Sequence, residues 1–598
     1  MPQRITPIKY TARDFSSIKQ ELVSYAKRYY PETFRDFNEA SFGALMLDMV
    51  SYIGDNLSFY LDYQANESFF DTATERSNLI RHAKQMGYKF RGSPSSVGVC
   101  DFFIVVPANS TGLGPDTSYL PILKTGTEVA STAGTNFILT ENINFADSTN
   151  PVVAARVNDT TGLPTSYAVK SSGKVTSGSF KVERHSVGAF QRFLRIRLKS
   201  SQIVEILSIF DDQGHEYVGV DYLSQNVVYK EMSNRGTSAS DQAASVMKPV
   251  MVPRRFVVEQ DGSSVYIQFG YGSDSEVTTD SIAEPSQMVF NMSARSFIEE
   301  TSFDPSKMLD TDKFGIAPSD TTLTITYRVN NSRNVNAASN TVNSVISPIT
   351  EFPVSQTLSQ STVNAVVRSI ECNNESPVVG GLSRPSMEEI RRRAIDHFAT
   401  QNRAVTRQDY ESIAYSMPPQ FGAIKRCKIT KDSDSFKRNL NMYVLAENRN
   451  QTLTLASGVL KDNLKTWLGK YKMIHDTIDI IDGRVINFGI NYGIIADPNF
   501  NKFEVLEACN SALVGLYRYP GYFGEFLYIT DVYSVLNKID GVVDTYDVSF
   551  IQKQGGVYSD TTYNFAKNMS ADGRYLIVPD NVCMELKYGT KDIQGAIK

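Results

Sequence analysis

The side chains that most often perform catalysis or bind metals are scattered along this 598-residue chain. The densest polar set is Asp211, Asp212, His215 and Glu216, whose carboxylates and imidazole are of the kind that bind metal ions. A loop rich in carboxylates is more often simply hydrated, and we expect that here. The five histidines stand far apart, at positions 82, 185, 215, 397 and 475. The sequence therefore predicts no metal site and no histidine-based catalytic centre.

The short motifs that bind nucleotides or metals are also missing. The chain contains neither G-x-x-x-x-G-K-[ST] nor H-E-x-x-H. Gly270 and Gly272 lack the third glycine and the helix that phosphate binding requires, so a hairpin turn is expected there. Asp432 and Asp434 resemble the start of a calcium loop, but no glycine follows at the sixth position, which favours a solvated turn. We expect no cofactor and no enzymatic activity, although paired carboxylates for glycoside cleavage depend on spatial separation and stay open.

Composition and charge are those of an ordinary globular chain. Lysine and arginine number 60 against 65 acidic residues, a net charge of −5, which argues against a nucleic-acid partner. No apolar run approaches the ~20 residues that span a bilayer, and the N-terminus lacks the apolar core of a secretion signal. The five cysteines lie far apart, which suits a reducing cytoplasm and small buried side chains. At roughly 100–200 residues per domain, about three to five domains are expected.

Residues 1–95 are predicted to form helices. A heptad seam in the first helix, which Pro31 ends, requires a partner helix and consists of Phe15, Ile18, Leu22, Tyr25 and Tyr29. A second helix over residues 42–63 has an apolar face too wide for a single neighbour. A third covers residues 74–86, with Gly87 as its C-terminal cap. Two interpretations stay open: a three-helix bundle within the chain, or a first helix that joins a bundle with other chains.

The remaining chain divides into three further regions, which make the fold α+β and multidomain. Residues 96–355 alternate polar and apolar side chains, which predicts a β-rich antiparallel middle of one or two domains. Residues 356–475 predict a helix-helix-strand core, in which Ser386 with Glu389 and Thr406 with Asp409 begin the two helices. Residues 476–598 predict a C-terminal α+β domain with a helix capped by Asp531 and a loose polar tail after Tyr588.

Several strings resemble one known family. They are N-E-S-F-F-D-T-A at 66–73, H-A-K-Q-M-G-Y at 82–88, S-M-E-E-I-R-R-R-A at 386–394 and A-V-T-R-Q-D-Y-E at 404–411. Together with residues 124–131, 324–336 and 523–548, they resemble the baseplate J-like family of contractile phage tails and related injection machines. Asn330, Asn331 and Asn334 stand where relatives usually carry glycines; asparagine tolerates positive φ better than most residues.

The resemblance implies a structural role in the virion tail baseplate, after assembly in the host cytoplasm. The chain looks most like the inner-ring wedge subunit of T-even-type tails. Such a subunit would associate with other wedge proteins, the tail hub and sheath-initiating proteins. It would also self-associate into dimers, with residues 476–598 as the dimerisation domain, and into a six-fold ring around the hub that relays the trigger for sheath contraction. Neither nucleic-acid binding nor membrane insertion is expected. The residues expected at its partner interfaces are Phe15, Ile18, Leu22, Tyr25, Tyr29, Phe526, Tyr528, Val542 and Tyr546.

Other functions stay open. One is a single-copy baseplate protein of a simpler tail or injection system. Two belong to other classes: a tail-associated glycan hydrolase, which an assay on purified polysaccharide would detect, and a receptor-binding adhesin, whose residues 150–350 would be labelled from outside the particle.

Charge suggests one more hypothesis about assembly. Residues 31–80 hold nine acidic and two basic side chains, and residues 381–430 hold nine basic and five acidic ones. These regions could meet between subunits, or each could be covered by local ion pairs. Arg391 to Arg393 are expected on a solvated helix face rather than in a nucleic-acid patch.

Overall fold

The computed structural model describes residues 14–32, 41–88, 94–110, 112–159, 162–200, 202–233, 245–261, 264–273, 314–331, 334–353, 358–383, 385–432 and 439–598. The chain forms two compact units. The first contains Met1–Phe90 and Pro385–Phe398, and the second contains Arg91–Arg384 and Ala399–Lys598. Part of the region predicted as a separate helix-helix-strand core therefore belongs with the N-terminal helices. The family-like strings at 66–73, 82–88 and 386–394 all fall within this first unit.

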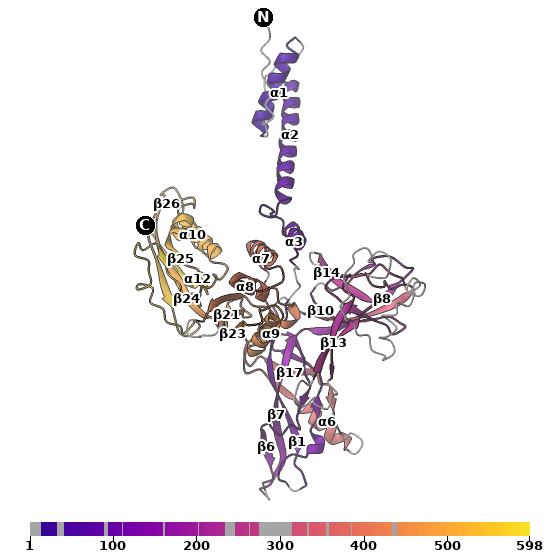
Figure 1. Cartoon of the computed structure of the whole chain (residues 1–598). Helices are drawn as coiled ribbons and strands as arrows, with labels where there is room; N and C mark the ends of the chain where they lie inside the picture. The colour runs from indigo at the N-terminus through magenta and orange to yellow at the C-terminus, as the bar shows by residue number, and fades with distance from the viewer. Residues whose placement is uncertain are drawn as a thin grey trace. The chain divides into compact units, whose positions relative to one another are not determined.

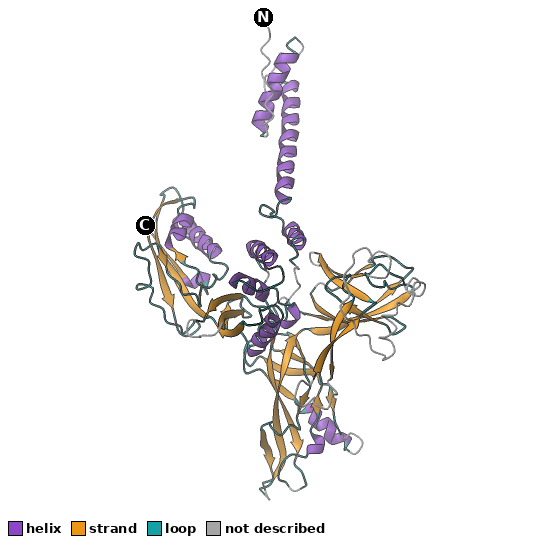
Figure 2. Ribbon diagram, in the orientation of Figure 1, coloured by secondary structure: helices purple, strands orange, loops and turns teal. Residues whose placement is uncertain are grey.

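The first unit consists of helices α1 (Phe15–Tyr29), α2 (Phe42–Glu67), α3 (Arg76–Gln85) and α7 (Met387–Thr400) (Figures 1 and 2). Helices α1 and α2 lie side by side, and we call this pair the helical hairpin. Helix α3 instead packs against α7, through a small core of Leu79, Ala83, Ile390 and Ala394. The three N-terminal helices lie where the sequence predicts them, and Gly87 follows α3 with a φ of 87°. They do not form the three-helix bundle considered above.

The helix starts predicted from capping boxes are confirmed. In α7, the backbone N–H of Glu389 donates to Ser386 Oγ over 3.1 Å, and the N–H of Ser386 donates to the Glu389 carboxylate over 3.3 Å. In α8 (Arg407–Tyr415), Thr406 and Asp409 make the same reciprocal pair. Each box satisfies N–H groups that the first turn of a helix leaves without an intrahelical acceptor.

The second unit begins with two sheets, each with its own core. The first sheet has the order β17-β3-β4-β7-β1-β19, with β6 paired to β7, and all of these pairs are antiparallel. Its strands are β1 (Val97–Pro107), β3 (Glu128–Ser131), β4 (Asn136–Leu139), β6 (Val152–Val157), β7 (Pro164–Ser177), β17 (Val342–Ser347) and β19 (Glu371–Asn373). Helix α6 (Gln360–Arg368) contacts β1, and the short strands β2 (Ile122–Leu123), β5 (Ile143–Asn144) and β18 (Thr350–Glu351) form a small sheet nearby.

The second sheet has the order β8-β16-β10-β11-β14-β15-β9. Its strands are β8 (Ser179–Val187), β9 (Arg195–Arg197), β10 (Ile203–Phe210), β11 (Glu216–Gly219), β14 (Arg255–Asp261), β15 (Ser264–Phe269) and β16 (Thr321–Val329). Val265, Ile267 and Phe269 are buried, as their alternation predicts. The pairing is antiparallel except between β11 and β14, which are parallel. Strands β12 (Val227–Ser233) and β13 (Ser245–Met251) pair as a separate ribbon.

The turn predicted at Gly270 and Gly272 is wrong. The N–H of Gly272 donates to the carbonyl of Gly315, and Gly272 forms a parallel bridge with Ile316. A Cβ atom on Gly270 would lie 2.0 Å from the carbonyl oxygen of Gly315. Glycine is therefore required here for close approach of two backbones rather than for a tight turn.

The third part of the second unit contains strand β20 (Arg426–Lys431), which pairs with β21 (Asn439–Glu447). Strands β22 (Leu453–Thr454) and β23 (Thr477–Asp482) also pair with β21. Helices α8 and α9 (Gly458–Gly469) pack on this sheet in a core that includes Tyr410 and Trp467. Residues 433–438, including Asp434 of the sequence that resembles a calcium loop, lie outside the described residues.

The C-terminal part is an α+β domain, as predicted. Its sheet joins β26 (Val542–Lys553), β24 (Arg484–Ala496), β28 (Val582–Glu585) and β29 (Ile593–Ile597). Helices α10 (Lys502–Leu516) and α11 (Ile529–Leu536) share its core. Strands β25 (Leu527–Tyr528) and β27 (Tyr575–Leu576) form a short pair, and α12 (Gly589–Asp592) precedes β29.

Two C-terminal predictions are wrong. The residues after Tyr588 are not a loose tail, because β29 pairs in parallel with the central strand β24 and Ile593 is buried. Asp531 does not cap α11; the capping position is Tyr528, and Asp531 lies within the first turn, where its charge still favours the helix dipole.

Candidate interaction surface

Helix α2 has two faces of different composition. The face toward α1 carries small or short polar residues: Ala44 and Ser51 are buried, and a Cβ on Gly54 would lie 3.2 Å from Ile18 Cδ1. Lys19 of α1 forms an ion pair with Asp48 over 2.6 Å. Small side chains let the two helices of the hairpin approach closely without burying the large apolar residues of α2.

The large apolar residues of α2 are on the other side of the helix and are exposed. At 3.6 residues per turn, they occupy roughly 200° of the helix circumference. The exposed fraction of each side chain lies between 37% and 73% for Phe42, Leu45, Met46, Met49, Val50, Tyr52, Ile53, Leu57, Phe59, Tyr60, Leu61 and Tyr63. We call these twelve residues the α2 apolar face. Contiguous apolar surface of this kind marks a site of association with another molecule.

The five seam residues of α1 divide into two groups. Phe15, Ile18 and Leu22 are half-buried, and Ile18 faces Gly54 of α2, so this part of the seam has a partner within the chain. Tyr25 and Tyr29 are about half exposed, and their ring centroids lie 4.6 Å apart. The heptad prediction of a partner helix is met in part by α2, and the two tyrosines extend the apolar surface onto α1.

The hairpin carries acidic charge at the edge of its apolar face. Helix α2 contains Asp48, Asp55, Asp62 and Glu67 and neither lysine nor arginine. Helix α1 begins at Asp14, whose carboxylate accepts hydrogen bonds from Ser16 and Ser17, which lower the pKa of Asp14 to about 2. The acidic residues of α2 repeat every seven positions up to Asp62, so they follow one line along the helix.

Glu67 ends α2 and has a structural role that the sequence did not reveal. The N-terminal capping residue of α3, Glu75, makes no side-chain cap. The Glu67 carboxylate instead binds the residues just before α3 and one side chain of its first turn: it accepts from the N–H of Thr74 over 2.7 Å and from Asn78 Nδ2 over 2.9 Å. Hydrogen bonds from Thr74 and Asn78 lower the pKa of Glu67 to about 2. Glu67 of the N-E-S-F-F-D-T-A string therefore connects the end of α2 to the start of α3, which begins nine residues later.

The four C-terminal residues expected at an interface lie in three places. Phe526 and Tyr528 are partly exposed and both contact Tyr575, Phe526 by stacking with centroids 5.4 Å apart. Tyr546 on β26 is partly exposed, with Lys598 Nζ 4.6 Å from its ring centroid. Val542 is half-buried and contacts the domain core. The structure brings Phe526 and Tyr528 together, and the interface role of all four stays a proposal.

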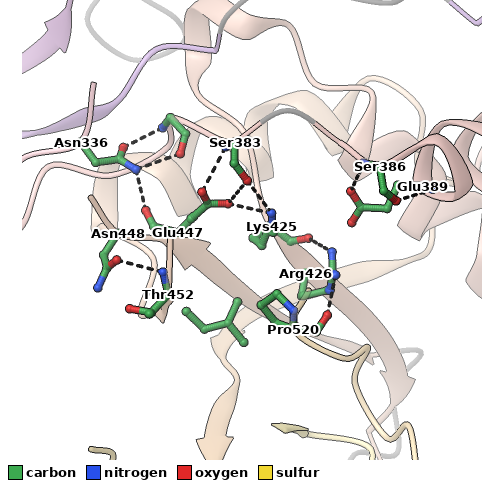
Figure 3. Close-up of polar contacts among 12 residues, drawn as sticks. Asn336, Ser383, Ser386, Glu389, Lys425, Arg426, Glu447, Asn448, Thr452 and Pro520 are labelled. Carbon is green, nitrogen blue, oxygen red and sulfur yellow. Dashed lines mark hydrogen bonds and ion pairs between the residues drawn. The ribbon is translucent and has the colours of Figure 1, made fainter. Parts of the chain in front are cut away.

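The family-like segment around Ser383 and Arg426 forms a buried polar network (Figure 3). Lys425 Nζ lies 2.7 Å from the Glu447 carboxylate, and both side chains are almost fully buried. Ser383 donates to the same carboxylate from its N–H over 3.1 Å and from Oγ over 2.9 Å. Asn336 binds the carbonyls of Gly381 and Glu447, over 2.9 and 2.7 Å. This network joins the segment between β16 and β17 to Gly381, Ser383 and β21, so it has a structural role.

Arg426, next to Lys425, is buried and donates to three backbone oxygens. Nε donates to Gly521 over 3.0 Å, Nη1 to Lys425 over 3.0 Å and Nη2 to Pro520 over 2.6 Å. Its guanidinium also lies 4.3 Å from the ring centroid of Tyr522. A guanidinium satisfies several carbonyls at once, which fits its place between β20 and the C-terminal domain.

The residues considered for metal binding have other partners. Asp211 accepts from the N–H of His215 over 2.7 Å and lies 3.0 Å from its Nδ1, while Thr321 donates to Asp212 over 2.5 Å. Glu216 forms an ion pair with Lys230. No group of three potential metal ligands occurs among the residues that the structure describes. The five cysteines are buried and free, and burial raises the pKa of Cys372 to about 12, which keeps its thiol protonated.

The three asparagines at family glycine positions do not use positive φ. Asn330 is buried and accepts from Ser177 Oγ over 3.1 Å, Asn331 donates to the carbonyl of Gly134 over 2.8 Å, and Asn334 donates to that of Arg449. Their side-chain amides therefore join neighbouring segments, which glycine could not do.

Basic residues of the 381–430 region are largely used within the chain. Arg391 donates to the carbonyls of Phe70 and Ala73, Lys425 pairs with Glu447, and Lys428 pairs with Asp580. Arg391 is thus not on a solvated face as expected, whereas Arg392 is more exposed and lies 3.9 Å from Asp396. These contacts favour local pairing over a charged contact between subunits.

Within the described residues, no helix is long and apolar enough to cross a membrane.

The helical hairpin and α3 coincide with a known sequence family. Residues 14–85 match the family described as bacteriophage baseplate protein, N-terminal domain. No curated protein matches the chain. A chain in the cryo-EM structure of the anti-feeding prophage (AFP) baseplate, 6-fold symmetrised, matches with 10% identity and a TM-score of 0.22. That match covers 97% of this chain and 90% of the other.

The family match supports a structural protein of the phage tail baseplate. The matched residues are the ones that carry the α2 apolar face, so the sequence family and the exposed surface point to the same part of the chain.

Proposed function

We propose that this chain is a structural wedge subunit of the baseplate of a contractile phage tail, and that its helical hairpin enters a helical bundle with other baseplate chains. The J-like resemblance of the remaining sequence suggests that copies pair through the C-terminal domain and form a six-fold ring around the tail hub. A change in these contacts would relay the trigger for sheath contraction.

The observation that carries the proposal is the α2 apolar face. Fully burying a leucine or phenylalanine side chain contributes roughly 1.5–3 kcal/mol, so twelve large exposed side chains forgo a large stabilisation in the isolated chain. A wide apolar face on a 26-residue helix is expected to contact more than one neighbour. Helix α1 covers only the opposite, small-residue side, which leaves the apolar face for helices of other chains.

Replacing the centre of the apolar face tests the proposal. Met49, Ile53, Leu57 and Tyr60 are changed together to glutamine, which is a good helix former. Because these side chains are exposed, we expect unchanged helix content and thermal unfolding of the purified chain. We expect loss of co-assembly with the other baseplate proteins of the same phage, measured by size-exclusion chromatography with light scattering and by electron microscopy.

The matched control carries threonine at Val152, Val153 and Val157, exposed apolar residues of β6. It should assemble like the natural chain, because the substitutions keep strand propensity and lie outside the hairpin. Normal assembly of the four-glutamine variant would reject the bundle proposal.

A further inference from the structure

The segment between α2 and α3 is fixed from both sides within the first unit. On one side is the Glu67 carboxylate, which accepts from the backbone of Thr74 and Glu75 and from Asn78. His82 of α3 also contacts the Glu67 carbonyl through Nε2, over 2.9 Å. The last residue of α2 is thus bound to the first and second turns of α3.

On the other side is Arg391 of α7. Its Nε donates to the Phe70 carbonyl over 3.2 Å and its Nη2 to the Ala73 carbonyl. A second arginine makes the reverse contact: Arg76 of α3 donates from Nη1 to the Pro385 carbonyl over 2.8 Å. Two guanidinium groups therefore join α7 to the segment from Phe70 to Arg76, across more than 300 residues of sequence.

The remaining contacts leave the segment little freedom. Ala73 is fully buried, its N–H donates to the Phe69 carbonyl, and Thr72 Oγ1 donates to the Asn66 carbonyl over 2.7 Å. Helix α2 is continuous from Phe42 to Glu67 and packs along α1. Near its C-terminal end, Tyr63 Oη also donates to the Glu75 carboxylate over 3.3 Å. The direction of the hairpin is consequently set where α2 ends.

We infer that Glu67 and Arg391 are positioning residues, which fix the direction in which the helical hairpin leaves the α3–α7 pair. The proposed function supplies only the reason for a fixed direction: a rigid hairpin would present its apolar face to partners at a defined angle. A preorganised surface loses less conformational entropy on binding than a mobile one. A displacement of a bound hairpin would then be transmitted to α7 rather than absorbed at the joint.

The test uses the purified full chain without partners, so it is independent of assembly. Spin labels are placed at Tyr52→Cys on α2 and Ser77→Cys on α3, both exposed, and the five natural cysteines are buried. In the chain that carries only these two labelled cysteines, we expect double electron–electron resonance to give one narrow distribution of label-to-label distances. It should broaden in Glu67→Gln and Arg391→Met. Hydrogen exchange at Thr74 and Glu75 should rise about tenfold or more in Glu67→Gln, because a charge-assisted hydrogen bond is weakened.

Matched controls are Asp71→Asn, an exposed acid in the same segment, and Arg392→Met, the neighbouring arginine. Both should leave distances and exchange unchanged. Protection near Leu79 separates positioning from folding: broadening with this protection retained supports the inference. Unchanged distances in both test variants would overturn it, as would loss of protection throughout α3 in both, because the residues would then hold the fold rather than the direction.

Discussion

Single buried polar residues hold this chain together where distant segments meet. The Glu447 carboxylate pairs with Lys425 and accepts from Ser383, and Asn336, between β16 and β17, donates to the Glu447 carbonyl. Burying such a group costs free energy unless every partner is present, because the group loses its hydrogen bonds to water and the protein interior must supply others. Their removal one at a time is therefore more damaging than their net contribution to stability suggests.

Replacing Lys425 by methionine should lower the free energy of unfolding by about 3–5 kcal/mol, because the Glu447 carboxylate stays buried without its cation. The single tryptophan, Trp467, lies in the core packed on β20 and β21, so its fluorescence reports unfolding of this part in urea. Adding Glu447→Gln should recover much of the loss.

Lys428→Met is the control for this substitution. Its partner Asp580 is largely exposed, so the cost should stay below about 1 kcal/mol. Equal effects of the two lysine substitutions would contradict the buried network as the source of stability.

Among the elements, the capping boxes at the starts of α7 and α8 were predicted from sequence, whereas the contacts of Glu67 at the start of α3 were not. Ser386 with Glu389 and Thr406 with Asp409 stand three residues apart and act within one turn. Glu67 accepts hydrogen bonds from Thr74 and Asn78, which the turn between α2 and α3 brings close to it. The N-E-S-F-F-D-T-A string marked this segment in the sequence, but only the hydrogen bonds in the structure show what Glu67 does there.

The C-terminal strand β29 should be essential to the last domain. Deleting residues 589–598 removes the parallel pairing with β24 and the buried Ile593 and Asp592, so we expect a lower midpoint of thermal unfolding and faster hydrogen exchange in β24. Asp592 also accepts from Tyr558 Oη over 2.7 Å, a contact that raises the pKa of Tyr558 to about 12.

Substitution of the exposed Gln594 and Ala596 by serine keeps the strand and provides the control for this deletion. An unchanged midpoint after the deletion would mean that the last strand adds nothing to the domain.

For the whole molecule, the salt dependence of assembly separates the two origins of association. A charged contact between the 31–80 and 381–430 regions would weaken strongly as salt rises, because mobile ions screen exposed charges. The structure uses Arg391, Lys425 and Lys428 within the chain and leaves an apolar face on α2. We therefore expect the dissociation constant for baseplate partners to change less than about threefold between roughly 0.1 and 0.5 M sodium chloride.

Sedimentation equilibrium or light scattering at several salt concentrations measures this dependence. A tenfold or larger loss of affinity over the same range would restore the charged contact as the main source of association.

The sequence alone determined the helices of the N-terminal region, the alternation of β15, the capping boxes of α7 and α8 and the α+β class, because these depend on spacing within a few residues. Tertiary structure decided which residues meet: α3 with α7, Arg391 with Ala73, β29 with β24, and Gly270 with Gly315. It also decided which face of α2 stays exposed, since an apolar pattern does not state whether its partner lies in the same chain. Pairings across hundreds of residues leave no local period, so no window of sequence could show them.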